Sequence, residues 1–440
     1  MIRTEQHRLE RDIAMDRGHI VYQTYLKILR RELVCAMGCT EPIALAYCAA
    51  AARSALGALP DRIVVEASGN VIKNVKSVVV PHTGGRRGIA VAAAVGVLGG
   101  DAHAGLEVLS PVSEETIDRL GPYLEQKQIE IKPLASDNLL DMIVTVYSGA
   151  AYAKVRIANE HTNIVLIERN GEILLKKDPQ ENGEAEDTPD YSLLTVERIY
   201  DFACTCDLDD VRDILDRQIE CNTAIAEDGL RNDYGANIGK VLLKTGDDLR
   251  TRAKAYAAAG SDARMNGSEL PVVICSGSGN QGLTVSLPVI VYARGLQADK
   301  EALYRALLIS NLITLHAKAG IGRLSAYCGA VSAGAGAGAG IAYLLGGDVR
   351  VISHTIVNAL AIASGIVCDG AKSSCAAKIA TAVDTGIFGY EMFKNGQQFY
   401  GGDGLVVKGV ENSIASFGRL ARVGMRETDL EIIRMMTEQH

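Results

Sequence analysis

The sequence predicts an α+β fold in which a large Gly/Ala-rich, all-helical catalytic domain is joined to a smaller α+β domain with a mainly antiparallel sheet. Three observations predict it. Between residues 60 and 176, short segments alternate apolar and polar side chains, as half-buried strands do. Residues 177–191 are polar and acidic, which is typical of an exposed loop or linker. Residues 192–440 have a helical pattern that is broken by glycine clusters.

The N-terminal part, residues 1–59, is expected to be a helical segment that packs on the helical domain. Residues 1–34 contain no proline and space their apolar residues three and four apart, which predicts a helix. A break at Met37-Gly38 precedes an Ala-rich run to about Leu56, for which we expect a second helix.

Residues 60–176 are expected to form the sheet, interrupted by one helix at Ile89–Leu98. The expected strands are Arg62–Ala67, Lys76–Val80, Gln128–Lys132, Met142–Tyr147, Tyr152–Ile157 and Asn163–Glu168. The core has to be built from Ala, Val, Ile and Leu, because there is no tryptophan and aromatic residues make up only 5% of the chain.

Charge and composition exclude some functions. Lys and Arg number 45 against 53 Asp and Glu, so the net charge of −8 argues against nucleic-acid binding by broad charge attraction. The uncharged stretch 326–347 has the length of a membrane span, but it is mostly Ala, Gly and Ser, which favours a tightly packed interior helix. Residues 1–17 are charged and no apolar signal segment follows them, so we expect a cytoplasmic protein whose ten cysteines are reduced.

A candidate reactive thiol lies in Gly38-Cys39-Thr40-Glu41-Pro42. Thr40 is expected to be a helix N-cap, with Glu41 and Pro42 in the first turn. Cys39 would then lie at a helix N-terminus, where the partial positive charge favours the thiolate over the thiol. Such a thiolate acts as a nucleophile or a general base; the alternative is a small buried residue before the helix.

The segment Ser276-Gly277-Ser278-Gly279-Asn280-Gln281-Gly282 contains the pattern G-x-G-x-x-G. A dinucleotide site requires a helix to open directly after the glycines, whereas residues 283–288 are rich in β-branched side chains and end in a proline. We therefore expect a tight loop, not a NAD site. Its free N–H groups suit a small anion such as a carboxylate.

Two further segments carry candidate ligands. Cys328, Cys368 and Cys375 lie beside Gly or Ser-Ser breaks, but their spacing matches neither a ferredoxin nor a zinc-ribbon pattern, so spacing alone is a weak metal signal. Residues 81–88 (PHTGGRRG) contain Thr83 and Arg87 at the end of an expected strand, which predicts a carboxylate-binding corner; the alternative is a solvated turn.

Together these segments resemble the L-cysteine desulfidase family, with its uncharacterised relatives, which is similar to the α-domain of iron–sulfur L-serine dehydratases. The resemblance is carried by GCTEPIALA, SGNVIKNVKSVVVPHTGG, GSGNQG, GRLSAYCGA and CDGAKSSCAAK, and it extends from about residue 25 to 430. One departure precedes GCTEP: the family has a proline-containing segment there, whereas this chain reads Leu33-Val34-Cys35-Ala36-Met37. Cys35 is thus an additional thiol with no assigned role.

The resemblance implies an oxygen-sensitive [4Fe–4S] lyase that converts L-cysteine to pyruvate, ammonia and hydrogen sulfide without pyridoxal phosphate. Its cluster ligands would be Cys328, Cys368 and Cys375, and Cys39 would be the catalytic base. Three thiolate ligands leave one iron open, as Lewis-acid catalysis requires. The residues that we expect to hold the substrate carboxylate and amine are Ser278, Asn280, Gln281, Thr83 and Arg87.

Three functions are compatible with the sequence. The first is an iron–sulfur lyase acting on L-cysteine, or on L-serine at the same site. The second is a non-catalytic Fe–S or thiol redox sensor that uses the same cysteines. The third, a membrane component, rests only on residues 326–347. We expect the lyase, with a small amino-acid substrate, no nucleic-acid or membrane partner, and a homodimer as the ordinary assembly.

Overall fold

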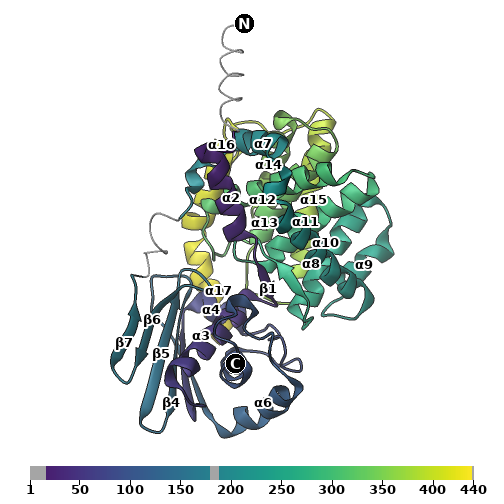
Figure 1. The fold of residues 1–440 in the computed structure, drawn as a ribbon. Helices are drawn as coiled ribbons and strands as arrows, with labels where there is room; N and C mark the ends of the chain where they lie inside the picture. The colour runs from purple at the N-terminus through teal and green to yellow at the C-terminus, as the bar shows by residue number, and fades with distance from the viewer. Residues whose placement is uncertain (1–15, 179–187, 439–440) are drawn as a thin grey trace.

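The computed structural model describes residues 16–178 and 188–438 and has the α+β architecture that the sequence predicts. Figure 1 shows the sheet at the lower left and a cluster of helices at the upper right. One hydrophobic core runs through both parts, since buried side chains of the sheet such as Val65 and Val144 belong to the same cluster as Leu312 and Ile356 of the helices.

The N-terminal segment divides between the two parts. Helix α2 (Ile20–Glu32) packs against the helical part, where the rings of Tyr22 and Tyr25 each meet Phe202 edge-on at 5.2 Å. Strand β1 (Cys35–Met37) follows, and helix α3 (Thr40–Leu56) then packs on strands β4 and β5 of the sheet. The expectation that this whole segment packs on the helical domain therefore holds for α2 and is wrong for α3. The part of the expected first helix at residues 1–15 lies outside the described residues.

The main sheet has six strands in the order β3-β2-β4-β5-β6-β7. Their bounds are β2 Arg62–Ala67, β3 Gln128–Pro133, β4 Asp141–Ser148, β5 Ala151–Ala158, β6 Ile164–Arg169 and β7 Glu172–Lys176. Only β2 and β3 pair in parallel, so the prediction of a mainly antiparallel sheet is confirmed. Strand β7, at the edge, was not predicted.

The expected strand Lys76–Val80 is wrong. The chain instead forms helix α4 (Gly69–Val75) and then a turn, in which an isolated bridge joins Val79 to Arg87 and the Val80 N–H donates to the Arg86 carbonyl at 2.9 Å. Val78, Val79 and Val80 are buried in this turn, which accounts for the apolar run in the sequence. Val79 and Val80 pair within the turn instead of joining the sheet. Helix α5 (Ile89–Gly99) agrees with the prediction, and α6 (Glu114–Gln126) packs against it.

The helical part is an array built around helix α13 (Gly329–Leu344), which contacts α11, α12, α14 and α15. The other helices are α7 Val196–Thr205, α8 Arg212–Arg231, α9 Ile238–Thr245, α10 Leu249–Met265, α11 Gly279–Gly295, α12 Lys300–Ala319, α14 Val349–Ala363, α15 Cys375–Lys394 and α16 Val410–Arg419. A short π-helical turn then leads to α17 (Arg426–Glu438), which packs against α4.

Helix α13 accounts for much of the Gly/Ala-rich sequence. Cβ atoms added at Gly334 and Gly338 would lie 2.3 and 2.5 Å from backbone oxygens of α15, and those at Gly336 and Gly340 would lie 2.1 and 2.8 Å from atoms of α12. The glycines therefore alternate between two faces, and each face allows a neighbouring helix to approach backbone to backbone. The uncharged stretch 326–347 is thus an interior helix, and no helix within the described ranges is long and apolar enough to cross a bilayer.

Replacing Gly338 with alanine is expected to lower the thermal midpoint. The obstacle is the backbone oxygen of Gly386, which moves only if two helices separate, so we expect a cost of roughly 1–3 kcal/mol or more. Alanine's helix propensity, worth about 1 kcal/mol, offsets part of this at most. Gly365→Ala is the matched control because no atom lies within 4 Å of its added Cβ. Equal midpoints for the two variants would show that the α13–α15 contact is loose.

Candidate active site

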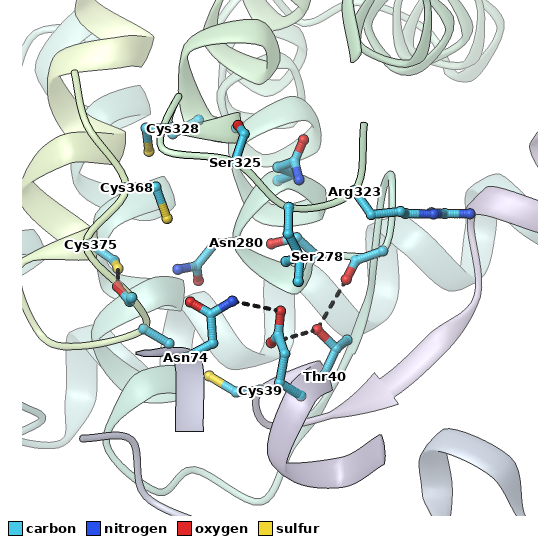
Figure 2. A pocket seen from close by; sticks show the side chains of 18 of the residues that line it. Cys39, Thr40, Asn74, Ser278, Asn280, Arg323, Ser325, Cys328, Cys368 and Cys375 are labelled. Atoms are coloured by element: carbon cyan, nitrogen blue, oxygen red, sulfur yellow. Dashed lines mark hydrogen bonds between the residues drawn. The ribbon is translucent and has the colours of Figure 1, made fainter. Parts of the chain in front are cut away.

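A cavity of about 110 Å³ lies where the N-terminal ends of α3, α11, α13 and α15 meet beside α4 (Figure 2). It brings together sequence segments that are up to 336 residues apart in the chain, from Cys39 to Cys375. The thiols that line it are those of Cys39, Cys328, Cys368 and Cys375. The four cysteines that the sequence singled out therefore face one space.

The four helices that begin at this cavity lack side-chain caps. Their N-cap residues are Cys39, Ser278, Cys328 and Ser374, and none of these side chains accepts a hydrogen bond from the first turn. By contrast, α10, α12 and α14 do not begin at the cavity, and an aspartate side chain caps each of them. Uncapped N–H groups and helix dipoles of the same sign favour anions, so the cavity is suited to thiolates, sulfide or a carboxylate.

Two backbone segments hold the cysteine trio in place. The Cys328 N–H donates to the Ile366 carbonyl at 3.1 Å, and the Cys368 N–H donates to the Ala326 carbonyl at 2.6 Å. These bonds join the start of α13 to the loop after α14, while Cys375 is the first residue of α15. In Figure 2 the three side chains lie along one side of the cavity, with the Cys39 sulfur at its lower edge.

Burial disfavours the thiolate form of Cys328 and Cys375 in the chain by itself. Burial, and then the nearby Cys368 sulfur, raise the pKa of Cys328 to about 12, and burial also raises the pKa of Cys375. In the chain by itself these two groups are therefore neutral thiols at pH 7. Such thiols ionise when a metal cation replaces the proton, which is the behaviour of metal ligands.

Cys39 is fully enclosed, and its Sγ lies 3.5 Å from the sulfur of Met265. Burial raises the pKa of its thiol to about 12, against the opposing effect of the Arg264 charge. The prediction of a thiolate favoured by the helix end is therefore wrong for the chain alone, because desolvation outweighs the dipole. Cys39 itself is the N-cap, and Thr40 is the first helical residue; its hydroxyl donates to the Gly277 carbonyl at 3.0 Å.

Glu41 supplies a permanent negative charge in the cavity. Burial raises the pKa of its carboxyl, but the nearby imidazole of His161, whose Nε2 lies 3.7 Å from Oε1, outweighs burial and lowers it to about 2. The carboxylate accepts a hydrogen bond from the Asn74 amide at 3.1 Å, and it shares the single proton of the Thr40 hydroxyl, 3.1 Å away, with the Gly277 carbonyl. Sequence analysis placed Glu41 in the first helical turn and gave it no role in binding.

The glycine-rich segment 276–282 forms the opposite wall. Ser276 and Gly277 adopt positive φ angles of 51° and 73°, and helix α11 then opens at Gly279. The expectation that no helix follows the glycines is wrong, because the burial of nearly the whole helix overrides the β-branched residues and accommodates Pro288. A dinucleotide site is still not supported: the preceding strand β8 (Pro271–Val273) pairs antiparallel with β1, so this segment forms no parallel βαβ unit.

Several buried polar groups around the cavity find no partner among the described residues. They include Nε of Arg264 and Oε1 of Gln281. Arg264 does hold Asn280, with its Nη1 3.1 Å from the amide oxygen. Lys318 lines the cavity at 4% exposure, and burial lowers the pKa of its amine to about 8, so it is mainly cationic at pH 7. The unpaired Arg264 donor and the Lys318 cation suit an anionic ligand, whereas the Gln281 oxygen can only accept a hydrogen bond.

Arg323 lines the same cavity but is already paired. It donates to both carboxylate oxygens of Glu32, at 2.8 and 3.0 Å, and Figure 2 shows its side chain directed away from the cysteines. The cations left to meet a substrate carboxylate are therefore Arg264 and Lys318, neither of which the sequence singled out. In the sequence, Lys318 follows a mostly apolar helical segment and looks like an ordinary cation near a helix C-terminus.

The C-terminal helix supports the cysteine loop from below. The Lys73 amine, 1% exposed, donates to Asp429 of α17 at 2.6 Å and to the Cys368 carbonyl at 3.4 Å. Asn70 donates to the other Asp429 oxygen at 2.8 Å. A buried ion pair that also bonds a neighbouring backbone fixes that backbone, so α4 and α17 set the position of the Cys368 carbonyl.

The expected carboxylate-binding corner is not part of the cavity. The Thr83 hydroxyl donates to the Val80 carbonyl at 2.6 Å, and Arg87 extends over the surface to the Ser77 carbonyl. Both groups serve the turn itself. The turn supports the site indirectly, since Pro81 packs so closely on Gly38 that a Cβ there would lie 2.3 Å from the ring.

Asp262 lies on α10, two residues before Arg264. The pH dependence of stability tests how it is buried. Burial raises the pKa of its carboxyl to about 6, although the Gly239 N–H donates to it at 3.0 Å. Since the folded-state pKa exceeds the unfolded value, folding favours the protonated form, and stability falls as pH rises from about 4 to 6. Relative to the native chain, Asp262→Asn should gain stability over that window, on the order of 3 kcal/mol, and gain nothing more above it. Thermal midpoints at pH 4.5, 5.5 and 7.5 test this; a constant difference would contradict it.

Comparisons with known proteins agree with this architecture. A sequence model described as serine dehydratase alpha chain matches residues 103–434. A UPF0597 protein of Desulfitobacterium hafniense is 58% identical over 97% of this chain and 99% of its own length. UPF0597 proteins of Lachnoclostridium phytofermentans and Finegoldia magna are 51% and 47% identical, over 94% and 95% of this chain and the full length of each relative. The chain therefore belongs to the serine dehydratase alpha chain family, together with the UPF0597 proteins.

Proposed function

We propose that this chain is a β-eliminating lyase that converts L-cysteine and water to pyruvate, ammonia and hydrogen sulfide, using a [4Fe–4S] cluster held by Cys328, Cys368 and Cys375. The observation that carries the proposal is the composition of the one cavity. It combines three candidate ligand thiols, a fourth thiol at a helix end, an ionised carboxylate and unpaired buried cations. A zwitterionic amino acid needs both signs of charge in its binding site.

The donor set suits the cluster better than a single metal ion. Across residues 16–178 and 188–438, no three His, Cys, Asp or Glu side chains converge as the ligands of one ion do. A [4Fe–4S] cluster takes each thiolate on a different iron, so the three sulfurs need not converge. When bound, it would supply an iron atom without a protein ligand, which acts as a Lewis acid toward the leaving sulfur. The start of α13, which no side chain caps, would donate N–H bonds beside Cys328.

The remaining residues would bind and orient the substrate. Lys318 and Arg264 would pair with its carboxylate, Glu41 would accept hydrogen bonds from its ammonium group, and the start of α11 at Ser278, Asn280 and Gln281 would complete the wall. In the elimination, Cys39 as a thiolate takes the Cα proton. The C–H electron pair becomes the second bond between Cα and Cβ, the Cβ–S bond breaks, and the sulfur leaves with the electron pair of that bond and takes up a proton to give hydrogen sulfide. The enamine product then tautomerises and is hydrolysed by water to pyruvate and ammonia.

L-Serine is the alternative substrate, and the family description favours it. The two amino acids differ by one atom at the leaving position, so the same charged groups would bind either one. A redox sensor built on the same cysteines is the alternative without turnover.

Anaerobic purification and cluster reconstitution, followed by an absorption spectrum and assays of sulfide and pyruvate, test the proposal. We expect a broad iron–sulfur absorption, turnover of L-cysteine above that of L-serine, and loss of activity in air. Pyruvate from L-serine alone would make the protein a serine dehydratase, and a cluster without turnover would make it a sensor. An iron-free, inactive protein after reconstitution would overturn the proposal.

A further inference from the structure

A second thiol site lies outside the cavity, between β1 and α8. The Sγ atoms of Cys35 and Cys221 are 3.9 Å apart, and Nε of Arg217 donates to the Cys35 sulfur at 3.1 Å. Arg217 and Cys221 are four residues apart on α8, so they present their side chains from one face of that helix. Neither cysteine lines the candidate active site.

The surroundings of this pair differ from those of the structural cysteines. Cys48 and Cys275 are fully buried, and burial raises the pKa of each thiol. Cys35 and Cys221 are only half-buried, and Cys221 lines an open surface depression with Arg217 and Pro271. A small solute can therefore reach this pair from solvent.

We propose that Cys35 and Cys221 form a peroxide-reactive oxidation site, in which Cys35 is the attacking thiol and Cys221 the resolving thiol. The charge that activates Cys35 is in place: a hydrogen bond from Cys221 and the Arg217 guanidinium lower the pKa of its thiol to about 7, against the effects of burial and of Glu107. Cys221 is correspondingly held as the thiol, with its pKa raised by the same hydrogen bond.

The reaction is written with hydrogen peroxide as the oxidant. The Cys35 thiolate attacks one peroxide oxygen, the O–O bond breaks, and hydroxide leaves and takes up a proton, so that Cys35 becomes a sulfenic acid and one water forms. The Cys221 sulfur then attacks the Cys35 sulfur, and the S–O bond breaks. The hydroxide leaves with the Cys221 proton as a second water. Two thiols and one peroxide thus give one disulfide and two waters.

The disulfide would form behind the candidate active site. Cys35 opens β1, which leads to Cys39 within four residues, and Cys35 lies opposite Val273 of β8, which leads into the 276–282 wall. A disulfide between β1 and α8 would therefore tie α8 to the two segments that carry these cavity residues. The site is independent of whether the cavity turns over any substrate.

Limited hydrogen peroxide, followed by alkylation, trypsin digestion without reduction and mass spectrometry, tests the proposal on the full chain purified without oxygen. Cys221 is the single cysteine of the tryptic peptide 218–231, so the expected product is that peptide joined to peptide 32–53. Peptide 32–53 also holds Cys39 and Cys48, so Cys35→Ser must abolish the joined product.

Three variants separate the roles of the residues. Cys221→Ser should leave a sulfenic acid at Cys35 that dimedone traps, and Arg217→Gln should slow the oxidation of Cys35 by roughly threefold or more, because it loses the cation. Cys204→Ser, which replaces a half-buried thiol elsewhere, should change nothing. Thermal midpoints confirm that each variant is folded. Oxidation of Cys35 no faster than that of Cys204, or a joined product that persists in Cys35→Ser, would overturn the assignment.

Discussion

Cys39→Ala is expected to abolish elimination while leaving the iron–sulfur absorption unchanged. Cys39 lies in the cavity with the three candidate ligands, but on a different helix, and its sulfur contacts Met265. Removing a general base costs about 10²–10⁴-fold in rate. The rate of pyruvate formation, measured together with the iron content of the reconstituted protein, separates loss of the base from loss of the cluster.

The matched control is Cys48→Ala. Cys48 lies on the same helix and is equally buried, but its thiol donates to the Val155 carbonyl on the sheet side, away from the cavity. We expect this variant to lose some stability and to keep its turnover. Full turnover in Cys39→Ala would end the assignment of the base, whereas loss of iron in that variant would indicate that Cys39 is a ligand.

The role of Cys39 as a base has to be reconciled with its neutral thiol in the chain alone. A base must be ionised, and burial raises the pKa of this thiol to about 12. The groups that oppose burial are the positive charge of Arg264 and the uncapped start of α3. Arg264 also has an unpaired Nε, so in the proposed site it would both act on the charge of Cys39 and bind the substrate carboxylate. The sequence could show the helix end but not the burial, because the burial arises from contacts with Val78 and with Met265 of α10.

The fold was predictable where the local pattern and the tertiary environment agree. Strand β5 alternates because one of its faces is buried, and its bounds follow from that pattern. Helix α11 was missed because its β-branched residues and Pro288 argue locally against a helix that packing on all sides stabilises. Helix α4 was missed for a related reason: seven residues carry too little periodicity to separate a helix from a strand.

The residues of the candidate site were likewise predictable only in part. Cys328 and Cys368 could be found because cysteines beside glycine or serine breaks in the helical pattern stand out in a sequence. Both line the cavity. Lys318 and Arg264 could not be found, because a sequence does not show whether a lysine or an arginine is buried or exposed. Thr83 was misplaced because its hydroxyl satisfies the backbone of its own turn, a contact that only the folded turn reveals.

Glu41→Gln tests the other half of the proposed binding site, the group that meets the ammonium of the substrate. The glutamine side chain has the same shape and keeps an oxygen that can accept from Thr40 or Asn74, but it has no charge. A hydrogen bond to a charged group contributes about 1.5–3 kcal/mol, so kcat/KM should fall by roughly 10- to 150-fold, mainly through KM. Glu130→Gln, on the exposed strand β3, is the control and should leave kinetics unchanged.

The pH profile distinguishes this role from that of a proton carrier. Since the pKa of Glu41 is about 2, its carboxyl is ionised throughout an assay between pH 5 and 9. A group whose pKa is depressed in the folded state keeps its charge above that value, so the loss in Glu41→Gln should be the same at every pH in the range. A loss that disappears at the acidic end would instead mean that Glu41 titrates during turnover. It would then act on protons, and another group would have to hold the ammonium of the substrate.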